Sequence, residues 1–318
     1  MLNLNNIRKN ILLALADKPT GHLGGSLGTV EIQSLILSNF IQYDPSWYSQ
    51  YNSFPNQQKL QKAIELRNQR NKFILSNGHT CPTLYTIWAE MGLFDEYIEA
   101  EYAGKITKNL SIPQKRLEFL KTIRSVDGVL EGHPSLHHLP FLVDSSTGPL
   151  GIGAGTSLGF AYNDIIRNNG LQTFVIVGDG ECQEGQIWES AMIATKLQLN
   201  NLIWIVDRNF IQIDGHTEEV GGLDNSEIIS PNDNPISGLG EKFSAFGWIV
   251  TENWEGNNYQ KCQEILEQTL AIQGQKNLPA VIINYSQVGY PFKEFNSFHW
   301  HGKTPTLQQA QTAIKSLN

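Results

Sequence analysis

The sequence is poor in cysteine and in clustered positive charge. Its 318 residues include three cysteines, Cys81, Cys182 and Cys262, which form no closely spaced pair. Neither a disulfide framework nor a cysteine-rich metal site is therefore expected. Lysine and arginine number 23 against 31 aspartates and glutamates, giving a net charge of −8, and no basic cluster stands out. This charge pattern excludes the electrostatic signature of a nucleic-acid-binding protein.

The sequence also lacks long hydrophobic runs, although apolar residues make up 40% of it. No stretch approaches the ~20 apolar residues of a membrane-spanning helix. The apolar run between Ile7 and Leu15 is too short and too closely flanked by charge for a secretory signal peptide. We therefore expect a cytoplasmic globular protein whose residues 1–318 form one large domain.

Short β-branched runs alternate with helical patterns over much of the chain. The expected strands are 72–76, 173–177, 202–206, 248–251 and 280–285. Helices are expected around 7–15, 27–40, 57–68, 84–91, 95–103, 112–124, 151–162, 184–199, 239–246, 258–273 and 306–317. Buried strands joined through helices indicate an α/β fold with an open, mostly parallel sheet covered by helices on both faces.

Two segments depart from this alternation. Residues 20–26 are rich in glycine and are expected to form a turn. Residues 45–72 are polar, rich in Gln and Asn, and interspersed with aromatic side chains. We expect this second segment to be a surface insertion, since surface loops tolerate such additions. A subunit contact or a lid shaped by its aromatic residues is the alternative.

Polar side chains follow two neighbouring strands of the expected sheet. Gly178-Asp179-Gly180 comes after one strand, and Asp207-Arg208-Asn209 comes at the end of the next. Asp179 and Asn209 should meet, because parallel strands end at one edge of a sheet. Their oxygens suit Mg²⁺ or Ca²⁺, and the amino end of the helix near Glu184 favours a diphosphate. A plain tight turn with Asn209 capping the loop is the alternative.

The Gly-Asp-Gly turn followed by Asn209 resembles the diphosphate and metal motif of thiamine diphosphate enzymes. Residues 178–215 as a whole are similar to the corresponding block of transketolases. Four further segments resemble that family in the same order: GHLGGSLG at 21–28, KFILSNGH at 72–79, GHP with STGPLGIG at 132–134 and 146–153, and WHG at 300–302. The resemblance covers nearly the whole chain. It implies the thiamine diphosphate-binding fold of the N-terminal subunit of a split transketolase.

The resemblance also implies a set of site residues. Asp179, Asn209 and the backbone carbonyl of Ile211 would bind the metal. His79 and His301 would contact the diphosphate, while His22 and His133 would face the reactive carbon of the cofactor and the substrate hydroxyls. The catalytic residues are then His22, His133, His301 and Glu184, and the remaining cofactor contacts are Gly148, Pro149, Leu150, Gly178, Gly180 and Glu181. A structural hydrogen bond remains open for each histidine, as does a plain helix-entry turn for 148–150.

Two glutamates, Glu184 and Glu189, have two interpretations of equal weight. The resemblance implies that they lie where two cofactor sites meet, so that buried facing carboxylates could share protons. Alternatively they are acidic residues of a first helical turn that complement the helix dipole. Leu23 departs from the family, which usually has proline there, and is expected to loosen that turn slightly. We expect His137, His138, His216 and His299 to be structural or surface residues.

The implied activity is transfer of a two-carbon ketol unit from a ketose or its phosphate to an aldose, with thiamine diphosphate and Mg²⁺ or Ca²⁺. In the family, the glutamate that activates the cofactor lies on a pyrimidine-binding domain, which we expect to be absent from this chain. A separate C-terminal subunit would then supply it, in an α2β2 heterotetramer. A thiamine-dependent acyl or hydroxyethyl transferase subunit and a non-catalytic scaffold remain alternatives.

Overall fold

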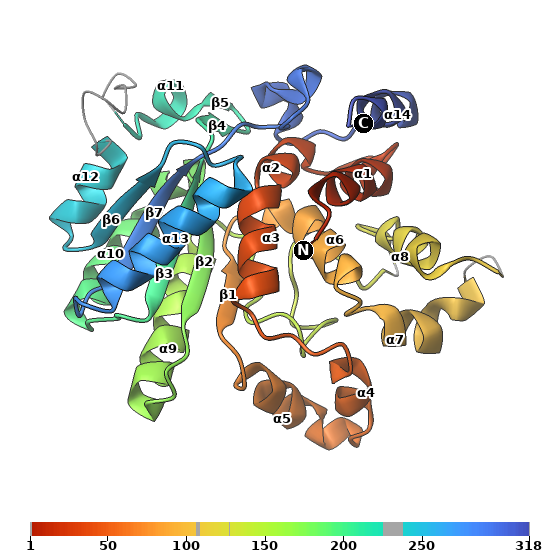
Figure 1. The fold of residues 1–318 in the computed structure, drawn as a ribbon, viewed down its shortest axis with the longest axis horizontal. Helices are drawn as coiled ribbons and strands as arrows, with labels where there is room; N and C mark the ends of the chain where they lie inside the picture. Colours follow the sequence, from red (N-terminus) through yellow and green to blue (C-terminus); the bar gives the residue numbers. More distant parts are fainter. Residues whose placement is uncertain (1, 106–108, 127, 225–237, 318) are drawn as a thin grey trace.

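The computed structural model describes residues 2–105, 109–126, 128–224 and 238–317 (Figure 1). Its α-helices are α1 (Leu4–Leu15), α2 (Leu23–Gly28), α3 (Val30–Asn39), α4 (Trp47–Asn52), α5 (Asn56–Arg67), α6 (Cys81–Glu90), α7 (Asp95–Tyr97), α8 (Ile112–Leu120), α9 (Ile152–Arg167), α10 (Gly185–Lys196), α11 (Thr217–Gly221), α12 (Gly238–Ala245), α13 (Tyr259–Gln273) and α14 (Leu307–Lys315). Its strands are β1 (Lys72–Leu75), β2 (Thr173–Gly178), β3 (Leu202–Arg208), β4 (Ile211–Gln212), β5 (Gly215–His216), β6 (Ile249–Asn253) and β7 (Ala280–Tyr285).

The five long strands form one parallel sheet in the order β1-β2-β3-β7-β6. Gly178 at the end of β2 lies opposite Asp207 of β3, and Asp207 in turn lies opposite Asn284 of β7. The carboxyl ends of β2, β3 and β7 therefore meet at one edge, as the sequence predicts. β4 and β5 form a separate small antiparallel pair directly after β3.

Both faces of the sheet are covered, because its strands carry apolar side chains on alternating sides. Phe174 and Ile176 belong to a core shared with α1, α3, α6 and α13. Val175 and Val177 belong to a second core shared with α9, α10 and α12. The predicted α/β architecture with helices on both faces is confirmed.

Helix α9 packs closely against the sheet because small residues begin it. A Cβ added to Gly153 would lie 2.6 Å from the Cα of Ser76, directly after β1. Gly151, which precedes the helix, has a φ of +81° and so adopts a backbone conformation that favours glycine. This small-residue run brings the start of α9 to the edge where the strands end.

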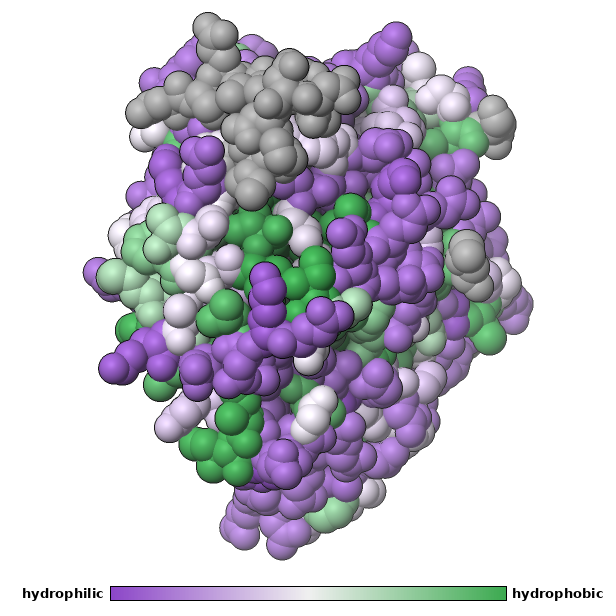
Figure 2. Space-filling view, turned by 60° about the vertical axis from the view of Figure 1, so that its left-hand side comes forward, coloured by the Kyte–Doolittle hydropathy of each residue, from purple (hydrophilic) through white to green (hydrophobic). Residues whose placement is uncertain are grey.

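The outer sides of α9 and α10 expose several apolar side chains. Ile152, Tyr162 and Ile166 of α9 are exposed, as are Met192 and Ile193 of α10. Figure 2 turns the left-hand side of Figure 1 forward and shows patches of apolar surface between polar side chains on that side of the molecule. Exposed apolar residues gathered on neighbouring helices are typical of a surface that contacts another chain.

The glycine-rich segment 20–26, expected to be a turn, instead runs into the buried helix α2. A Cβ on Gly24 would lie 2.4 Å from Val288 and 2.9 Å from the carbonyl oxygen of Trp300. Its glycines thus serve close packing beneath the C-terminal segment rather than turn formation. Leu23 begins this helix without disrupting it.

The expectation that 45–72 is a surface insertion is wrong for part of the segment. Trp47 and Tyr48 of α4 are buried and belong to the main core. Arg70 is also buried and forms an ion pair with Asp144, with 2.7 Å between Nη1 and Oδ2. Half of the residues of α5 are exposed, and Ala63 and Leu66 are buried. The aromatic residues anchor a segment whose polar composition suggests exposure.

The three cysteines lie in the interior of the described structure. Cys81, Cys182 and Cys262 are all buried and free. Among the helices of the described segments, none is both long and apolar enough to cross a membrane.

Candidate active site

A cavity of about 450 Å³ lies at the carboxyl ends of β1, β2 and β3. It is lined by His22, His79, His133, Gly148, Leu150, Gly178, Asp179, Gly180, Glu181, Glu184, Asn209, Ile211 and His301. They include every site residue expected from the sequence except Pro149, which is not among the residues that line the cavity. Small-molecule sites commonly have volumes of about 300 to 1,000 Å³. The fold therefore brings distant segments of the chain into one cavity of suitable size.

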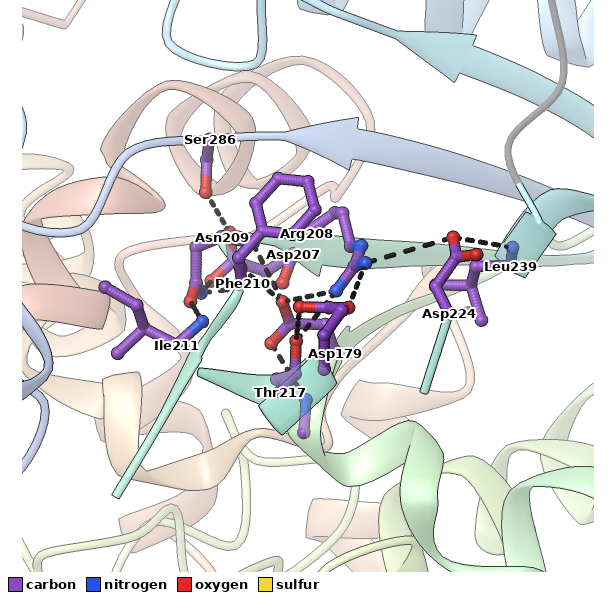
Figure 3. A network of polar contacts seen from close by, with 12 residues as sticks. Asp179, Asp207, Arg208, Asn209, Phe210, Ile211, Thr217, Asp224, Leu239 and Ser286 are labelled. Carbon is purple, nitrogen blue, oxygen red and sulfur yellow. Dashed lines mark hydrogen bonds and ion pairs between the residues drawn. The ribbon is translucent and has the colours of Figure 1, made fainter. Parts of the chain in front are cut away.

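Asp179 lines the acidic end of the cavity and belongs to the network of polar contacts drawn in Figure 3. Its Oδ1 accepts a hydrogen bond of 2.8 Å from the backbone N–H of Gly180, and its Oδ2 accepts bonds of 3.0 and 2.6 Å from those of Asn209 and Phe210. Burial raises the pKa of Asp179 to about 6, although the Arg208 guanidinium opposes the rise. The carboxylate is thus fixed in place by the loop that follows β3.

Phe210 holds part of this loop in an uncommon backbone conformation. Its φ of +64° lies in the left-handed region, which side-chain-bearing residues seldom adopt. Its ring lies beneath Arg208, with 3.9 Å from Cζ to the ring centroid, and near the ring of Tyr285 at 5.9 Å between centroids. These contacts support a conformation that directs the Phe210 N–H to Asp179, and such strained positions are common at functional sites.

Arg208 is surrounded by acidic side chains in this network (Figure 3). Its guanidinium lies 3.3 Å from Asp179, forms a short ion pair with Glu218, and lies 3.9 Å from Asp224. Nearby Asp207 accepts hydrogen bonds from the Ser286 hydroxyl and from the amide of Asn209. Burial raises the pKa of Asp207 to about 7, and the charge of Asp179 adds to the rise. One arginine thus serves several carboxylates, and this end of the cavity suits a cation.

The expected metal-binding residues lie together at this end. Asn209 Oδ1 accepts one hydrogen bond, of 3.0 Å, from the N–H of Ile211, and an amide oxygen can accept two. Within the described segments, His, Cys, Asp and Glu side chains form no cluster of three that could hold a metal. An ion here would instead use the Asp179 carboxylate with amide and backbone oxygens. Such oxygens are the ligands of Mg²⁺ and Ca²⁺, so the residues present fit either ion.

Four histidines form the opposite end of the cavity. The ring centroids of His22, His79 and His301 lie 4.9 to 5.8 Å apart. His133 lies beside Gly78 and Gly148, where added Cβ atoms would come 3.2 and 3.4 Å from its ring. Burial lowers the pKa of all four imidazoles, that of His22 to about 3. They are therefore neutral near pH 7, and each has one N–H donor and one nitrogen acceptor.

Glu181, which lines the cavity and is predicted to contact the cofactor, also connects three neighbouring segments. Its Oε1 accepts hydrogen bonds from the Ser76 hydroxyl and, at 2.6 Å, from the Gly151 N–H, while its Oε2 accepts one of 3.0 Å from the Gly178 N–H. The carboxylate thus joins the ends of β1 and β2 to the start of α9. This arrangement gives Glu181 a positioning role as well, and its contact with a cofactor stays a prediction.

Glu184 and Glu189 are both exposed in this chain. Glu184 lines the cavity and precedes α10, but its side chain makes no capping hydrogen bond. The first turn of α10 contains no acidic residue, so the alternative of first-turn acids is wrong. The other interpretation, facing carboxylates between two sites, requires a further chain and stays a prediction.

Sequence reasoning missed several residues of the site. Asn77, Gln183, Asp207, Gln212, Ile213 and Asp214 also line the cavity. The position of Asp207 near the end of an expected strand, two residues before Asn209, is a pattern from which its place in the site could be predicted. No such pattern marks Arg124, yet its guanidinium lies 3.3 Å from His22. Of the histidines set aside, His216 and His299 are exposed and His138 lies 2.9 Å from Glu131, in line with surface or structural roles.

Comparison with protein families gives one match that covers most of the chain. The family described as "Transketolase, thiamine diphosphate binding domain" matches residues 106–316.

Curated relatives of similar length are named as transketolase subunits. An apulose-4-phosphate transketolase subunit from Phocaeicola vulgatus is 25% identical over 312 residues, which cover 98% of this chain and 91% of the relative. The subunit of the same name from Actinobacillus succinogenes is 29% identical, with 98% and 93% covered. A 6-deoxy-6-sulfo-D-fructose transketolase subunit from a Clostridium species is 29% identical, with 86% and 80% covered.

Solved structures of longer proteins share the fold. A transketolase from Leishmania mexicana aligns with a TM-score of 0.70 at 24% identity, covering 99% of this chain and 41% of its own. A transketolase variant from Pichia stipitis aligns with a TM-score of 0.72 at 22% identity, with 99% and 40% covered. The chain thus spans about 40% of the length of these solved proteins.

Proposed function

Since this chain belongs to the family of transketolase thiamine diphosphate-binding domains, we propose that it provides the diphosphate and metal half of an active site for ketol transfer. A two-carbon unit would pass from a ketose to an aldose. The relatives of similar length act on apulose 4-phosphate and 6-deoxy-6-sulfo-D-fructose by name, and both are ketoses with an anionic group. We propose the same substrate class for this chain.

The observation that carries this proposal is the single cavity with an acidic end and a histidine end. Asp179, Asn209 and the carbonyl of Ile211 would hold Mg²⁺ or Ca²⁺, because they offer hard oxygens where negative charge is in excess. His79 and His301 would donate hydrogen bonds to the diphosphate. Thiamine diphosphate, when bound, supplies the chemistry that breaks and forms a carbon–carbon bond next to a carbonyl.

The remaining residues of the cavity would bind and orient substrate. His22 and His133 are neutral, so each carries one ring N–H that can donate a hydrogen bond to a sugar oxygen. Gly148 has a φ of +150° and leaves room beside His133, while the half-exposed side chain of Leu150 offers apolar contact area for the cofactor rings. Pro149 and Glu184 would complete the cofactor side of the cavity.

A partner subunit would complete the site. The relatives that match in length are named as subunits, and the chain corresponds to about 40% of the solved transketolases. Leu150, which lines the cavity, is exposed and apolar, as are Ile152 of α9 and Met192 and Ile193 of α10. We propose that a chain carrying the pyrimidine-binding domain covers this surface in an α2β2 heterotetramer.

The proposal is tested by purifying the tagged chain from its source cells in Mg²⁺ and thiamine diphosphate and measuring native mass and bound cofactor by mass spectrometry. We expect a second chain of comparable size and one cofactor per pair of chains. A parallel purification in a chelator should release the cofactor. Recovery of the chain alone and without cofactor, under both conditions, would contradict the proposal.

A further inference from the structure

Arg124 lies beside the histidine end of the cavity although nothing in its sequence context suggests a functional role. It follows α8 with a φ of +61°, and its backbone N–H donates to the carbonyl of Leu130 at 2.8 Å. This turn directs its partly buried side chain toward the segment that contains Thr20 and His22. The arginine thus connects the turn after α8 to the start of α2.

The guanidinium of Arg124 is held on several sides. Its Nη1 donates to the hydroxyl of Thr20 at 3.3 Å, and its Nη2 donates to the carbonyl of Gly132 at 3.3 Å. A Cβ added to Gly132 would lie 2.7 Å from Cζ and 2.9 Å from Nε, so the guanidinium fills the space that a side chain there would need. Gly132 therefore permits the position of Arg124.

The contact with His22 determines where that histidine carries its proton. Nη2 of Arg124 lies 3.3 Å from Nδ1 of His22. A guanidinium has donors and no acceptor, so Nδ1 must be the acceptor and is unprotonated. In a neutral imidazole the proton is then on Nε2, on the other side of the ring. We propose that Arg124 is a positioning residue that keeps His22 in the Nε2–H form, so that His22 acts in the cavity as a hydrogen-bond donor.

The charges around His22 support this role. Burial lowers the pKa of His22 most, and His301, Arg124 and His133 lower it further. The charge of Arg124 also lowers the pKa of His79 and His133, while Glu131 acts in the opposite direction on His133. Arg124 thus disfavours a second proton on the imidazoles around it. Near neutral pH, His22 keeps a single proton and presents it from Nε2.

This inference rests on the proposed function in one respect, the identity of the group that His22 meets. In ketol transfer, an Nε2–H donor would stabilise a sugar oxygen on which negative charge develops. The same nitrogen is then not the base that removes a proton from a hydroxyl. The tautomer itself depends on the described residues of this chain alone, so it is testable without substrate or partner.

The test is a long-range ¹H–¹⁵N NMR correlation of the ¹⁵N-labelled full chain at pH 7.5, which distinguishes protonated from unprotonated ring nitrogens. Loss of one pattern in His22→Gln assigns the His22 signals. We expect Nε2–H in the wild-type chain, an added Nδ1–H population in Arg124→Met, and retention of Nε2–H in Arg124→Lys. An Nδ1–H pattern in the wild-type chain, or an unchanged pattern in Arg124→Met, overturns the proposal.

Two controls separate this result from a folding defect. Arg167→Met makes the same substitution at an exposed position of α9 and should leave the His22 pattern unchanged. The signals of the exposed His299 should keep their positions in every variant if the fold is intact. Should Arg124→Met fail to fold, Thr20→Val removes one anchor of the guanidinium and should produce a smaller shift in the same direction. An unaltered tautomer in a folded Thr20→Val chain would then count against the proposal.

Kinetics of the assembly with its partner give a second, independent reading. Arg124→Met should lower kcat/KM about tenfold, since one oriented hydrogen bond is weakened. The Kd for thiamine diphosphate should remain unchanged, and Arg124→Lys should recover part of the rate. An unchanged kcat/KM overturns the positioning role. A confirmed tautomer in a chain that has no ketol-transfer activity with any partner contradicts the proposed function instead.

Discussion

One arginine contacts residues at each end of the cavity, but the two arginines face opposite electrostatic conditions. Arg208 lies among Asp179, Glu218 and Asp224, and a further carboxylate, Asp207, is close by. Arg124 instead lies 3.3 Å from His22, and its charge lowers the pKa of His22, His79 and His133. At the acidic end the arginine reduces an excess of negative charge, whereas at the histidine end it helps to exclude positive charge. The comparison shows how one cavity can suit a metal ion at one end and anionic or hydroxyl oxygens at the other.

The largest expected effect is a loss of cofactor affinity when the carboxylate of Asp179, at the acidic end of the cavity, is replaced. Asp179→Asn keeps the size of the side chain but removes the charge that attracts the metal. In the assembly with its partner, we expect the affinity for thiamine diphosphate in Mg²⁺ to fall by more than about 100-fold, measured by calorimetry. Glu264→Gln removes an exposed carboxylate on α13 and should leave the affinity unaltered. Retention of Mg²⁺-dependent binding by Asp179→Asn would contradict the assignment of this end to the metal.

A smaller effect is expected at the histidine end. His79→Gln removes an imidazole beside His22 and His301 and should weaken binding of thiamine diphosphate about tenfold, as one hydrogen bond to a charged group is lost. The dependence on Mg²⁺ concentration should be unchanged, because the acidic end is intact. A titration of cofactor at several Mg²⁺ concentrations measures both quantities. A shifted Mg²⁺ dependence would show that the two ends are not separable.

Stability should depend on pH in opposite directions at the two ends. The pKa of Asp207 is raised from 3.8 to about 7 in the folded chain. In the metal-free chain its ionisation therefore costs stability progressively between about pH 4 and pH 7, because the folded state retains the proton longer than the unfolded state. Asp207→Asn cannot ionise and should unfold in urea with a free energy about 1 to 3 kcal/mol higher than wild type at pH 8. This advantage should shrink toward pH 4, and a constant advantage would refute the electrostatic explanation.

The histidine end should respond to acid. The pKa of His22 falls from 6.5 to about 3 in the folded chain, so the unfolded chain binds protons first as pH decreases. The wild-type chain should lose part of its stability between about pH 6.5 and pH 3 through this residue. His22→Gln should lose about 1 kcal/mol less between pH 7 and pH 5 in urea unfolding. An equal pH dependence of the two chains would disprove the contribution of His22.

The smallest effect should follow from Phe210→Gly. Glycine adopts a φ of +64° without strain, but it loses the stacking of the ring with Arg208 and leaves the unfolded chain more flexible. We expect these contributions to offset one another to within about 1 kcal/mol of unfolding free energy. Affinity for the cofactor should change less than about threefold. A large loss of affinity would show that the ring itself positions the loop around Asp179.

The sequence predicted those parts of the site that follow from the order of the strands. Asp179 and Asn209 meet because β2 and β3 are adjacent and parallel, a relation that local apolar runs and one intervening helix already indicate. His22, His79, His133 and His301 were identified through short motifs that resemble a known family. That these four histidines line one cavity could not be predicted from the sequence, because it depends on contacts between segments that are far apart in the chain.

The errors have a common physical origin. The glycines of 20–26 predict a turn. Their missing side chains instead allow the C-terminal segment to pack closely against α2. The polar sequence neighbours of Trp47 and Tyr48 predict a surface position, yet both residues join the main core. No sequence pattern indicates the role of Arg124, because the fold brings its partners Thr20, His22 and Gly132 to it. Local composition does not report contacts of this kind.

The parallel sheet also has a consequence for biosynthesis. β1 pairs with β2, whose residues follow it by about a hundred positions, and β3 pairs with β7 rather than with the strand that comes next in the long sheet. During synthesis on the ribosome, β1 emerges long before β2, so β1 stays unpaired until β2 has been translated. Chains with such distant strand pairings fold slowly and populate intermediates that expose apolar surface and tend to aggregate. His301 lines the cavity, so the cavity is complete only after the segment that carries this residue has been translated.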